Sequence, residues 1–218
     1  MQRPIREPTG KALGSGGFGV RLLAFSDLHR DLRAAARIVA RSEEADVVVG
    51  VGDFASMHEG LDDVIGALSV ITKPTVLVAG NNETDEALRR ACGTFSGWPA
   101  ATVLHGESVR IAGVTFFGLG GGVPPTPWQW SFDLSEAEAE TKLASCPAGA
   151  VLVVHSPPIG HLDGTRRHLG STAILRTIEA TCPRLTLCGH IHECWGQEAK
   201  IGVTRVLNLG PDPTLVRL

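Results

Sequence analysis

Three features are scarce in this chain of 218 residues: aromatic side chains, an excess of charge of one sign, and long apolar runs. Tyrosine is absent, and aromatic residues make up only 5% of the sequence. Lysine and arginine number 20 against 23 aspartate and glutamate residues, a net charge of −3. No broad positive field therefore favours nucleic acid or an acidic membrane surface. No segment approaches the roughly 18–20 apolar residues that cross a bilayer, so no membrane association is expected.

Cysteine is sparse as well. Five cysteines at irregular spacing are an odd number, which argues against a disulfide framework and suits a reducing compartment. Residues 1–19 hold glycine, proline and charge but no continuous apolar stretch, so they do not resemble a secretory signal. We expect a cytoplasmic protein with a mobile lead-in over residues 1–19 and a single domain over residues 20–218.

Glycine is in surplus, at 26 of 218 residues, and much of it lies where apolar runs end. Short apolar runs alternate with segments of helical periodicity, and near-continuous apolar runs indicate strands buried on both faces. The runs cover 20–25, 46–50, 75–80, 114–119, 150–155, 185–189 and 204–209. The helical segments are 31–44, 58–70, 83–92, 134–144 and 171–180. With hairpin-like strands around 108–118 and 201–218, the pattern predicts an α/β sandwich whose sheets are covered by helices.

Side chains suited to metal binding follow five of these predicted strands. In α/β sheets, functional groups gather just beyond the carboxyl ends of the strands, and carboxylate, amide and imidazole atoms bind divalent transition metals. At three of the five ends a glycine directly precedes the candidate ligand, where the missing side chain lets the backbone turn tightly. The seven candidate ligands are Asp27, His29, Asp53, Asn81, His155, His190 and His192.

Seven donors are too many for one tetrahedral ion and suit two ions that share a carboxylate. Two metals roughly 3.5–4 Å apart can polarise a phosphoryl group and hold a hydroxide in line with the leaving group. Neutral ligands keep the net positive charge of such a centre high, so a slightly acidic chain can still bind an anionic substrate. The ligand set predicts metal-dependent hydrolysis of a phosphoester by a hydroxide that bridges two metals.

The order D-x-H, GD, GN, H and GHxH resembles that of the calcineurin-like metallophosphoesterase superfamily, from about Val20 to Gly210. The resemblance implies an αββα sandwich in which two mixed sheets are flanked by helices. It also implies two divalent cations at the strand ends, with manganese expected and iron, zinc or nickel as alternatives, because mixed oxygen and nitrogen ligands accept several ions.

The family's pattern divides the seven residues between the two metals. One metal would be held by Asp27, His29, Asp53 and His192. The other would be held by Asn81, His155 and His190, with Asp53 as the shared ligand.

Segments 155–171, 188–193 and 207–211 are more specifically similar to a compact subgroup that includes phosphodiesterases acting on 2′,3′-cyclic nucleotides and aryl diesters. Many superfamily members have a histidine directly after the motif asparagine, where it contacts phosphate and assists the leaving group. Here that position is Asn82, whose amide can donate a hydrogen bond but cannot transfer a proton at neutral pH. We therefore expect activated phosphodiesters of the cyclic nucleotide or aryl type to be preferred.

Three further features have an expected role. His168 is the best candidate for a substrate contact in the loop after His155. The proline- and tryptophan-rich segment 123–130 is expected to pack over the sandwich edge, to form a wall of the substrate cleft, or to join copies of the chain. Glu83 is expected to support the start of the helix that follows it.

Other functions stay open. A protein-interaction scaffold of the same fold would show no turnover, and a phosphomonoesterase would share the metal site. A nuclease would need a basic stripe with interleaved aromatic residues, which the sequence does not show. The expected partner is a small-molecule phosphoester, with neither nucleic acid nor a membrane, and a homo-oligomer is an open alternative.

Overall fold

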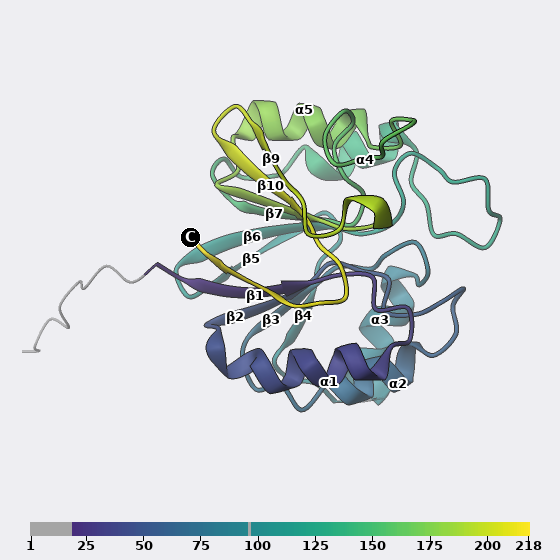
Figure 1. Cartoon of the computed structure of the whole chain (residues 1–218), viewed down its shortest axis with the longest axis vertical. Coiled ribbons are helices and arrows are strands. Elements are labelled where there is room, and N and C mark those ends of the chain that lie inside the picture. Colours follow the sequence, from purple (N-terminus) through teal and green to yellow (C-terminus); the bar gives the residue numbers. More distant parts are fainter. Residues whose placement is uncertain (1–18, 96) are drawn as a thin grey trace, which may run out of the picture.

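Two β-sheets packed face to face form the centre of the molecule, and helices cover both outer faces (Figure 1). The structure, a computed structural model, describes residues 19–95 and 97–218. The lead-in predicted for residues 1–19 therefore lies, apart from Gly19, outside the described residues. The predicted sandwich of two mixed sheets flanked by helices is confirmed.

The first sheet has five strands in the order β11-β1-β2-β3-β4, all parallel except β11. Its strands are β1 (Arg21–Phe25), β2 (Val47–Gly50), β3 (Thr75–Leu77), β4 (Ala101–Val103) and β11 (Thr214–Arg217). The helical elements on its outer side are α1 (Leu32–Arg41), η1 (Ser42–Glu44), α2 (Leu61–Leu68), α3 (Asp85–Arg90) and η2 (Ala91–Phe95).

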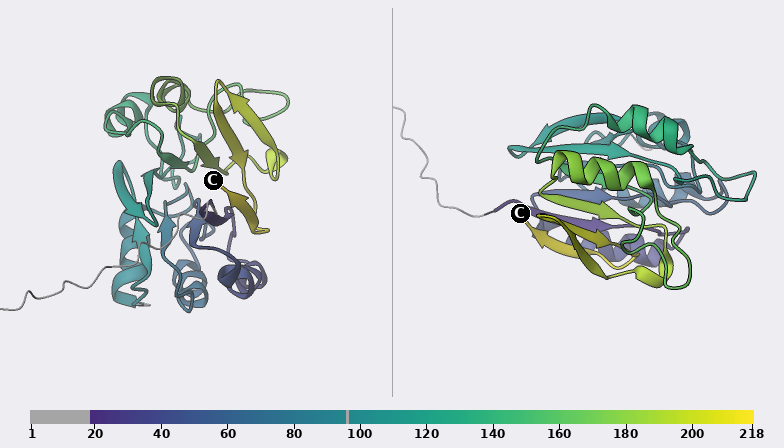
Figure 2. Two further views of the ribbon diagram at one scale, coloured as in Figure 1. Left: turned by 90° about the vertical axis from the view of Figure 1, so that its left-hand side faces the viewer. Right: turned by 90° about the horizontal axis from the view of Figure 1, so that it is seen from above.

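The second sheet has six strands in the order β5-β6-β7-β8-β10-β9, parallel in its middle and antiparallel at both edges. Its strands are β5 (Glu107–Ile111), β6 (Val114–Leu119), β7 (Val151–Val154), β8 (Leu185–Cys188), β9 (Glu198–Ile201) and β10 (Thr204–Asn208). Two helices lie over it, α4 (Glu136–Leu143) and α5 (Thr172–Thr181), and the short turn η3 (His192–Cys194) follows β8 (Figure 2). Among the helices of the described ranges, none combines the length and apolar composition that a bilayer crossing requires.

Alternation of side chains along the strands builds the core. In β1, Leu22 and Ala24 face the second sheet, whereas Leu23 and Phe25 pack against the helices. Because successive residues of a strand point to opposite faces, a strand buried on both sides needs apolar residues at every position. The near-continuous apolar runs of the sequence follow from this double burial.

The structure differs from the sequence expectation at the two ends of the sheets. The expected hairpin over 201–218 is partly wrong: β9 pairs with β10, but β11 crosses to the first sheet and pairs antiparallel with β1. The three-residue strand β4 was not expected, because so short a segment carries no resolvable periodicity. The predicted helix over 58–70 begins only at Leu61, since Met57, His58 and Gly60 have φ values of 49°, 68° and 73°.

The packing between the sheets generates a stability prediction. Phe116 is fully buried between them, so Phe116→Ala should lower the free energy of unfolding by about 3–5 kcal/mol through lost burial and a residual cavity. Val203, which is 73% exposed in the β9–β10 turn, supplies the control: Val203→Ala should change stability by less than about 0.5 kcal/mol. Denaturant unfolding measures both, and similar losses for the two variants would contradict this placement of the core.

Candidate metal centre

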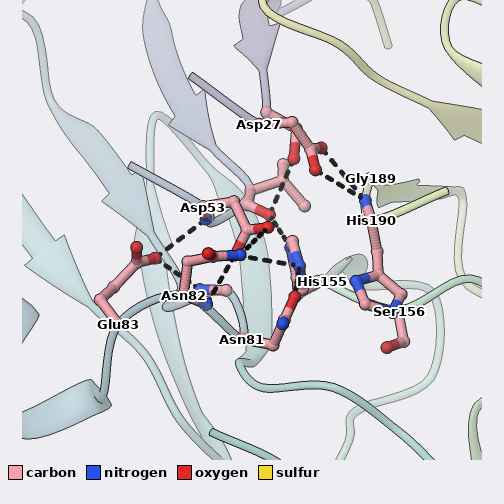
Figure 3. A network of polar contacts seen from close by, with 12 residues as sticks. Asp27, Asp53, Asn81, Asn82, Glu83, His155, Ser156, Gly189 and His190 are labelled. Carbon is pink, nitrogen blue, oxygen red and sulfur yellow. Dashed lines mark hydrogen bonds and ion pairs between the residues drawn. The ribbon is translucent and has the colours of Figure 1, made fainter. Parts of the chain in front are cut away.

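The loops that follow β1, β2, β3, β7 and β8 meet at one end of the sandwich and bring the predicted ligands together (Figure 3). Six of the seven fall into two groups whose ligand atoms lie within 4.8 Å of one another. The first group is Asp27, His29 and His192, and the second is Asp53, His155 and His190. The grouping coincides with the division of ligands that the family resemblance implies.

Asp53 belongs to the second group and also faces the first. Its Oδ2 is 3.6 Å from Nε2 of His29, and its Oδ1 is 3.4 Å from Nε2 of His155. One oxygen of the carboxylate therefore faces each group, which is the geometry that a shared ligand requires. On the side of the first group, Nε2 of His192 approaches Nε2 of His29 to 3.1 Å.

Asn81, the seventh candidate, also faces the second group. Its side-chain amide donates to Oγ of Ser131 at 3.0 Å, and its Oδ1 lies 3.3 Å from Nε2 of His155. The contact with Ser131 fixes the orientation of the amide, so the oxygen is the atom directed at the centre. Sequence reasoning missed Ser131, which lies 50 positions away and belongs to no motif.

The His155 ring is held on its other side as well. Its Nδ1 lies 2.8 Å from the carbonyl oxygen of Val51, to which an Nδ1–H donates. This hydrogen bond leaves Nε2 as the atom available to a cation.

The backbone is strained where these ligands leave their strands. Asp27, His29, Asp53 and His190 have φ values of 56°, 44°, 55° and 68°. Residues other than glycine seldom adopt this left-handed region, and such strain persists only where the surrounding structure enforces it, as at functional sites.

The three glycines that precede ligands are required by close approach. A Cβ on Gly80 would lie 2.0 Å from Oδ1 of Asp53, and one on Gly189 would lie 2.3 Å from Oδ2 of Asp27. At Gly52, where φ is 90°, a Cβ would lie 2.5 Å from the backbone nitrogen of Gly80. These loops pack backbone against ligand, and no larger residue fits between them.

Glu83 corrects one sequence expectation. Its carboxylate does not support the start of α3, which Thr84 caps by accepting from the backbone of Ala87. It is fully buried and accepts from the backbone nitrogens of Asp53, Gly80 and Ala55 at 2.7–2.9 Å. Glu83 thus joins the loops after β2 and β3, and its contact with Asp53 spans 30 residues, so no local pattern signals it.

The electrostatics of the centre favour a cation. Burial disfavours ionised Asp53, yet the positive charge of His155 and its hydrogen bond hold the pKa of Asp53 well below its usual range. Burial opposes protonation of His155, but Asp53 and Asp27 raise the pKa of this ring to about 9. Burial, together with the charge of His155, lowers the pKa of His190 to about 4. The negative potential that attracts a proton to His155 also attracts a divalent metal.

Burial and repulsion by Asp53 raise the pKa of Glu83 to about 8, against the hydrogen bonds from Gly80 and Ala55. Two buried carboxylates side by side are costly unless positive charge compensates them. This need, together with seven oxygen and nitrogen donors, fits two divalent cations.

The two residues predicted to act on substrate lie in different surroundings. Asn82 borders the centre: its side-chain nitrogen donates to Oδ2 of Asp53 at 2.7 Å, and its Oδ1 accepts from the backbone of Met57 at 2.9 Å. The second amide hydrogen of Asn82 is not used in these contacts.

His168 lies on the loop between β7 and α5, and its side chain is 67% exposed. Its Nδ1 is 3.0 Å from the carboxylate of the buried Asp163. The backbone and hydroxyl of Thr165 on the same loop donate to Glu193 of η3 at 2.6 and 3.1 Å. The loop is thereby fastened to the segment that carries His192, although His168 itself touches none of the seven candidate ligands.

Comparison with known proteins identifies the family of the chain. The family model for the calcineurin-like phosphoesterase superfamily domain matches residues 20–212 of the chain. The chain belongs to the calcineurin-like phosphoesterase superfamily. Members bind two metal ions, and the two groups of candidate ligands agree with that property.

Two curated relatives are similar to the chain in sequence. A UPF0046 protein of Caenorhabditis elegans is 28% identical over 196 residues, which are 81% of this chain and 65% of that protein. The human metallophosphoesterase domain-containing protein 1 is 32% identical over 116 residues, which are 48% of this chain and 33% of that protein. The chain thus spans less than two thirds of the length of these relatives.

Solved structures share the fold at low sequence identity. A protein of Thermus thermophilus has a TM-score of 0.73 at 17% identity, covering 91% of this chain and 99% of its own. A dimetal phosphatase from Danio rerio has a TM-score of 0.61 at 12% identity, covering 93% of each chain. A phosphopantetheinyl hydrolase from Mycobacterium tuberculosis has a TM-score of 0.60 at 14% identity, covering 89% of this chain and 91% of its own. At these identities the likeness establishes the fold alone.

The close packing at Gly80 generates a prediction about metal binding. Gly80→Ala places a methyl group against Asp53, so we expect affinity for Mn²⁺, measured by isothermal titration calorimetry, to fall at least about tenfold. Gly66 lies in α2 with open space around its Cβ position, and Gly66→Ala should stabilise the fold by roughly 0.5–1 kcal/mol without changing Mn²⁺ affinity. Native Mn²⁺ affinity in Gly80→Ala would show that the close packing of Gly80 against Asp53 is not needed for metal binding.

Proposed function

We propose that the chain hydrolyses phosphodiesters with two divalent cations, manganese foremost and iron, zinc or nickel as alternatives. The observation that supports this most directly is Asp53, one oxygen of which faces each group of candidate ligands. When bound, two cations polarise a phosphoryl group and make a coordinated water acidic. Asp27, His29 and His192 would hold one cation, and Asn81, His155 and His190 the other, with Asp53 shared by both.

The contacts around these side chains have a defined task in the proposal. Val51 and Ser131 fix which atoms of His155 and Asn81 face the centre. The backbone nitrogen of His190 donates to both oxygens of Asp27 at 3.2 and 3.1 Å, which orients that carboxylate. Groups held in this way lose little freedom when a cation or substrate binds, and such preorganisation accounts for much of the rate enhancement in enzymes.

Asn82 determines the preference for diesters in this proposal. Its spare amide hydrogen can donate to a phosphoryl oxygen, but the amide has no proton to give a departing alkoxide. An aryl diester, whose leaving group is already stable as an anion, does not need that proton, and a strained cyclic diester needs it less because opening of the ring assists departure of the sugar oxygen. Alkyl phosphomonoesters should therefore react more slowly.

His168 is proposed as a second substrate contact. Its Nδ1–H donates to Asp163, so the outer nitrogen is Nε2, and in the protonated ring Nε2–H can donate to a phosphoryl oxygen or an ester oxygen. Asp163 is suited to orienting the ring because it is buried and also accepts from the backbone nitrogens of Gly160 and Gly170.

We propose a small-molecule substrate and a cytoplasmic site of action. The five scattered cysteines are in keeping with a reducing compartment.

The function is tested by metal analysis of the purified protein coupled to a substrate panel. With Mn²⁺ present, we expect kcat/KM to be higher for aryl diesters and 2′,3′-cyclic nucleotides than for alkyl phosphomonoesters. Asp53→Asn is the matched impaired variant. It should lower Mn²⁺ affinity and lower kcat/KM at least about hundredfold, because removing a direct ligand costs more activity than removing a residue that only contacts a ligand. A higher kcat/KM on alkyl monoesters would replace the diesterase with a monoesterase, and absence of turnover on every ester would favour a binding scaffold.

The role of His168 yields a separate prediction. His168→Asn keeps a donor for Asp163 but removes the outer ring nitrogen, so kcat/KM on diesters should fall about tenfold to hundredfold, the worth of one hydrogen bond to a charged group. Mn²⁺ affinity should stay unchanged, because the residue contacts none of the candidate ligands. Native kcat/KM in His168→Asn would remove this residue from the proposed site.

A further inference from the structure

We propose that His58, Trp128 and Trp130, together with Met57, form a binding subsite for a planar aromatic group of the substrate, a nucleobase or the ring of an aryl ester. We call these four residues the aromatic rim. The inference rests on the proposed function, since the phosphoester at the metal centre would carry the planar group.

Direct contacts join the aromatic rim to both asparagines of the centre. The backbone nitrogen of His58 donates to the carbonyl oxygen of Asn82 at 2.8 Å, and that of Met57 donates to Oδ1 of Asn82 at 2.9 Å. Next to Trp130, the hydroxyl of Ser131 accepts from the side chain of Asn81 at 3.0 Å. A group resting on the rim therefore lies beside the residues that border a bound phosphoester.

The exposed surface of the rim has the chemistry that planar groups bind. The rings of Trp128 and Trp130 are stacked, with centroids 5.5 Å apart and planes inclined by 8°. Trp128 is 51% exposed and Met57 is 58% exposed, although aromatic residues make up only 5% of the chain. Exposed apolar clusters beside a polar centre mark binding sites, and a flat indole face stacks on any nucleobase.

The rim is also held in place before any ligand arrives. The carboxylate of Asp133 accepts from the backbone and hydroxyl of Thr126 at 2.8 Å and from the hydroxyl of Ser131 at 2.7 Å, which ties together both ends of the loop that carries the tryptophans. The ring of His58 donates to the carbonyl oxygen of Trp130 and meets its indole edge to face, with centroids 6.4 Å apart. A surface already ordered loses little entropy when a ligand stacks on it.

Paired probes with and without a planar group test the subsite. Adenosine 5′-monophosphate and ribose 5-phosphate are titrated against the Mn²⁺-loaded protein, with tryptophan fluorescence and calorimetry as readouts. We expect the nucleotide to bind about tenfold more tightly than the sugar phosphate, from one base–indole stack. In Trp128→Ala and Trp130→Ala this advantage should disappear, whereas Trp130→Phe should keep most of it because a flat ring remains.

Steady-state kinetics give a second readout. For aryl diesters and 2′,3′-cyclic nucleotides, both alanine variants should raise KM about tenfold, and KM for a dialkyl phosphate should not change. Val70→Ala is the control, because this apolar residue is 64% exposed beyond the end of α2. If the alanine variants raise KM for only one of these two substrate classes, the planar group of that class is the one that the rim binds.

The outcomes separate the two proposals. Absence of turnover with a retained nucleotide advantage would overturn phosphodiester hydrolysis and leave the subsite standing. Normal turnover with equal binding of the two probes, or with no change in the alanine variants, would overturn the subsite and point to packing or a protein partner for the rim. Because Trp128 is half in solvent, Trp128→Ala should fold even where Trp130→Ala does not, so the test does not depend on one variant.

Discussion

The candidate centre depends on the compensation of one buried carboxylate. Asp53 is almost completely shielded from water, and an ion in that position is tolerated only when hydrogen bonds and opposite charge replace its hydration. The backbone and side chain of Asn82 supply two hydrogen bonds, at 2.9 and 2.7 Å. The rings of His29 and His155 lie against the carboxylate, one at each oxygen, and the charge of His155 lowers the pKa of Asp53. Since these partners come from the loops after β1, β3 and β7, compensation of this single group fixes the relative position of strands in both sheets.

Glu83 adds to the free-energy cost of burying the Asp53 carboxylate. Its hydrogen bonds also explain why the loops keep their shape. A second buried carboxylate repels Asp53, and this repulsion contributes to the raised pKa of Glu83. In return it accepts three backbone N–H groups that the sharp turns after β2 and β3 would leave without partners, and an unpaired buried donor costs about 1–3 kcal/mol. The left-handed backbone of Asp53 and the forced glycine at position 80 belong to the same arrangement. Charge repulsion is thus concentrated where cations would relieve it.

How far the sequence predicts this arrangement depends on whether each contact is local. The ends of β1, β2 and β8 could be predicted, because an apolar run followed by glycine or a short polar motif is a pattern of a few residues. Glu83 could not, since an acidic residue before a helix usually supports that helix, and its actual partners lie mostly across a 30-residue gap. Ser131 and the pairing of β11 with β1 were inaccessible for the same reason, because each joins segments far apart in the chain. Local sequence patterns identify the candidate ligands, and tertiary packing decides which atom of each faces the centre.

The surroundings of the centre are unlike on its two sides, and this asymmetry bears on the substrate. The aromatic rim is fastened to Asn81 and Asn82, which follow β3 in the first sheet. The loop of His168 is fastened to η3, which follows β8 in the second sheet, through Thr165 and Glu193. A phosphomonoester has one substituent and can occupy only one such flank, whereas a diester has two. An apolar planar surface on one side and an imidazole held by a buried carboxylate on the other suit a diester whose substituents differ, one flat and one polar. An aryl diester of a polar alcohol meets that description, with its ring for the rim and the oxygens of its alcohol for His168.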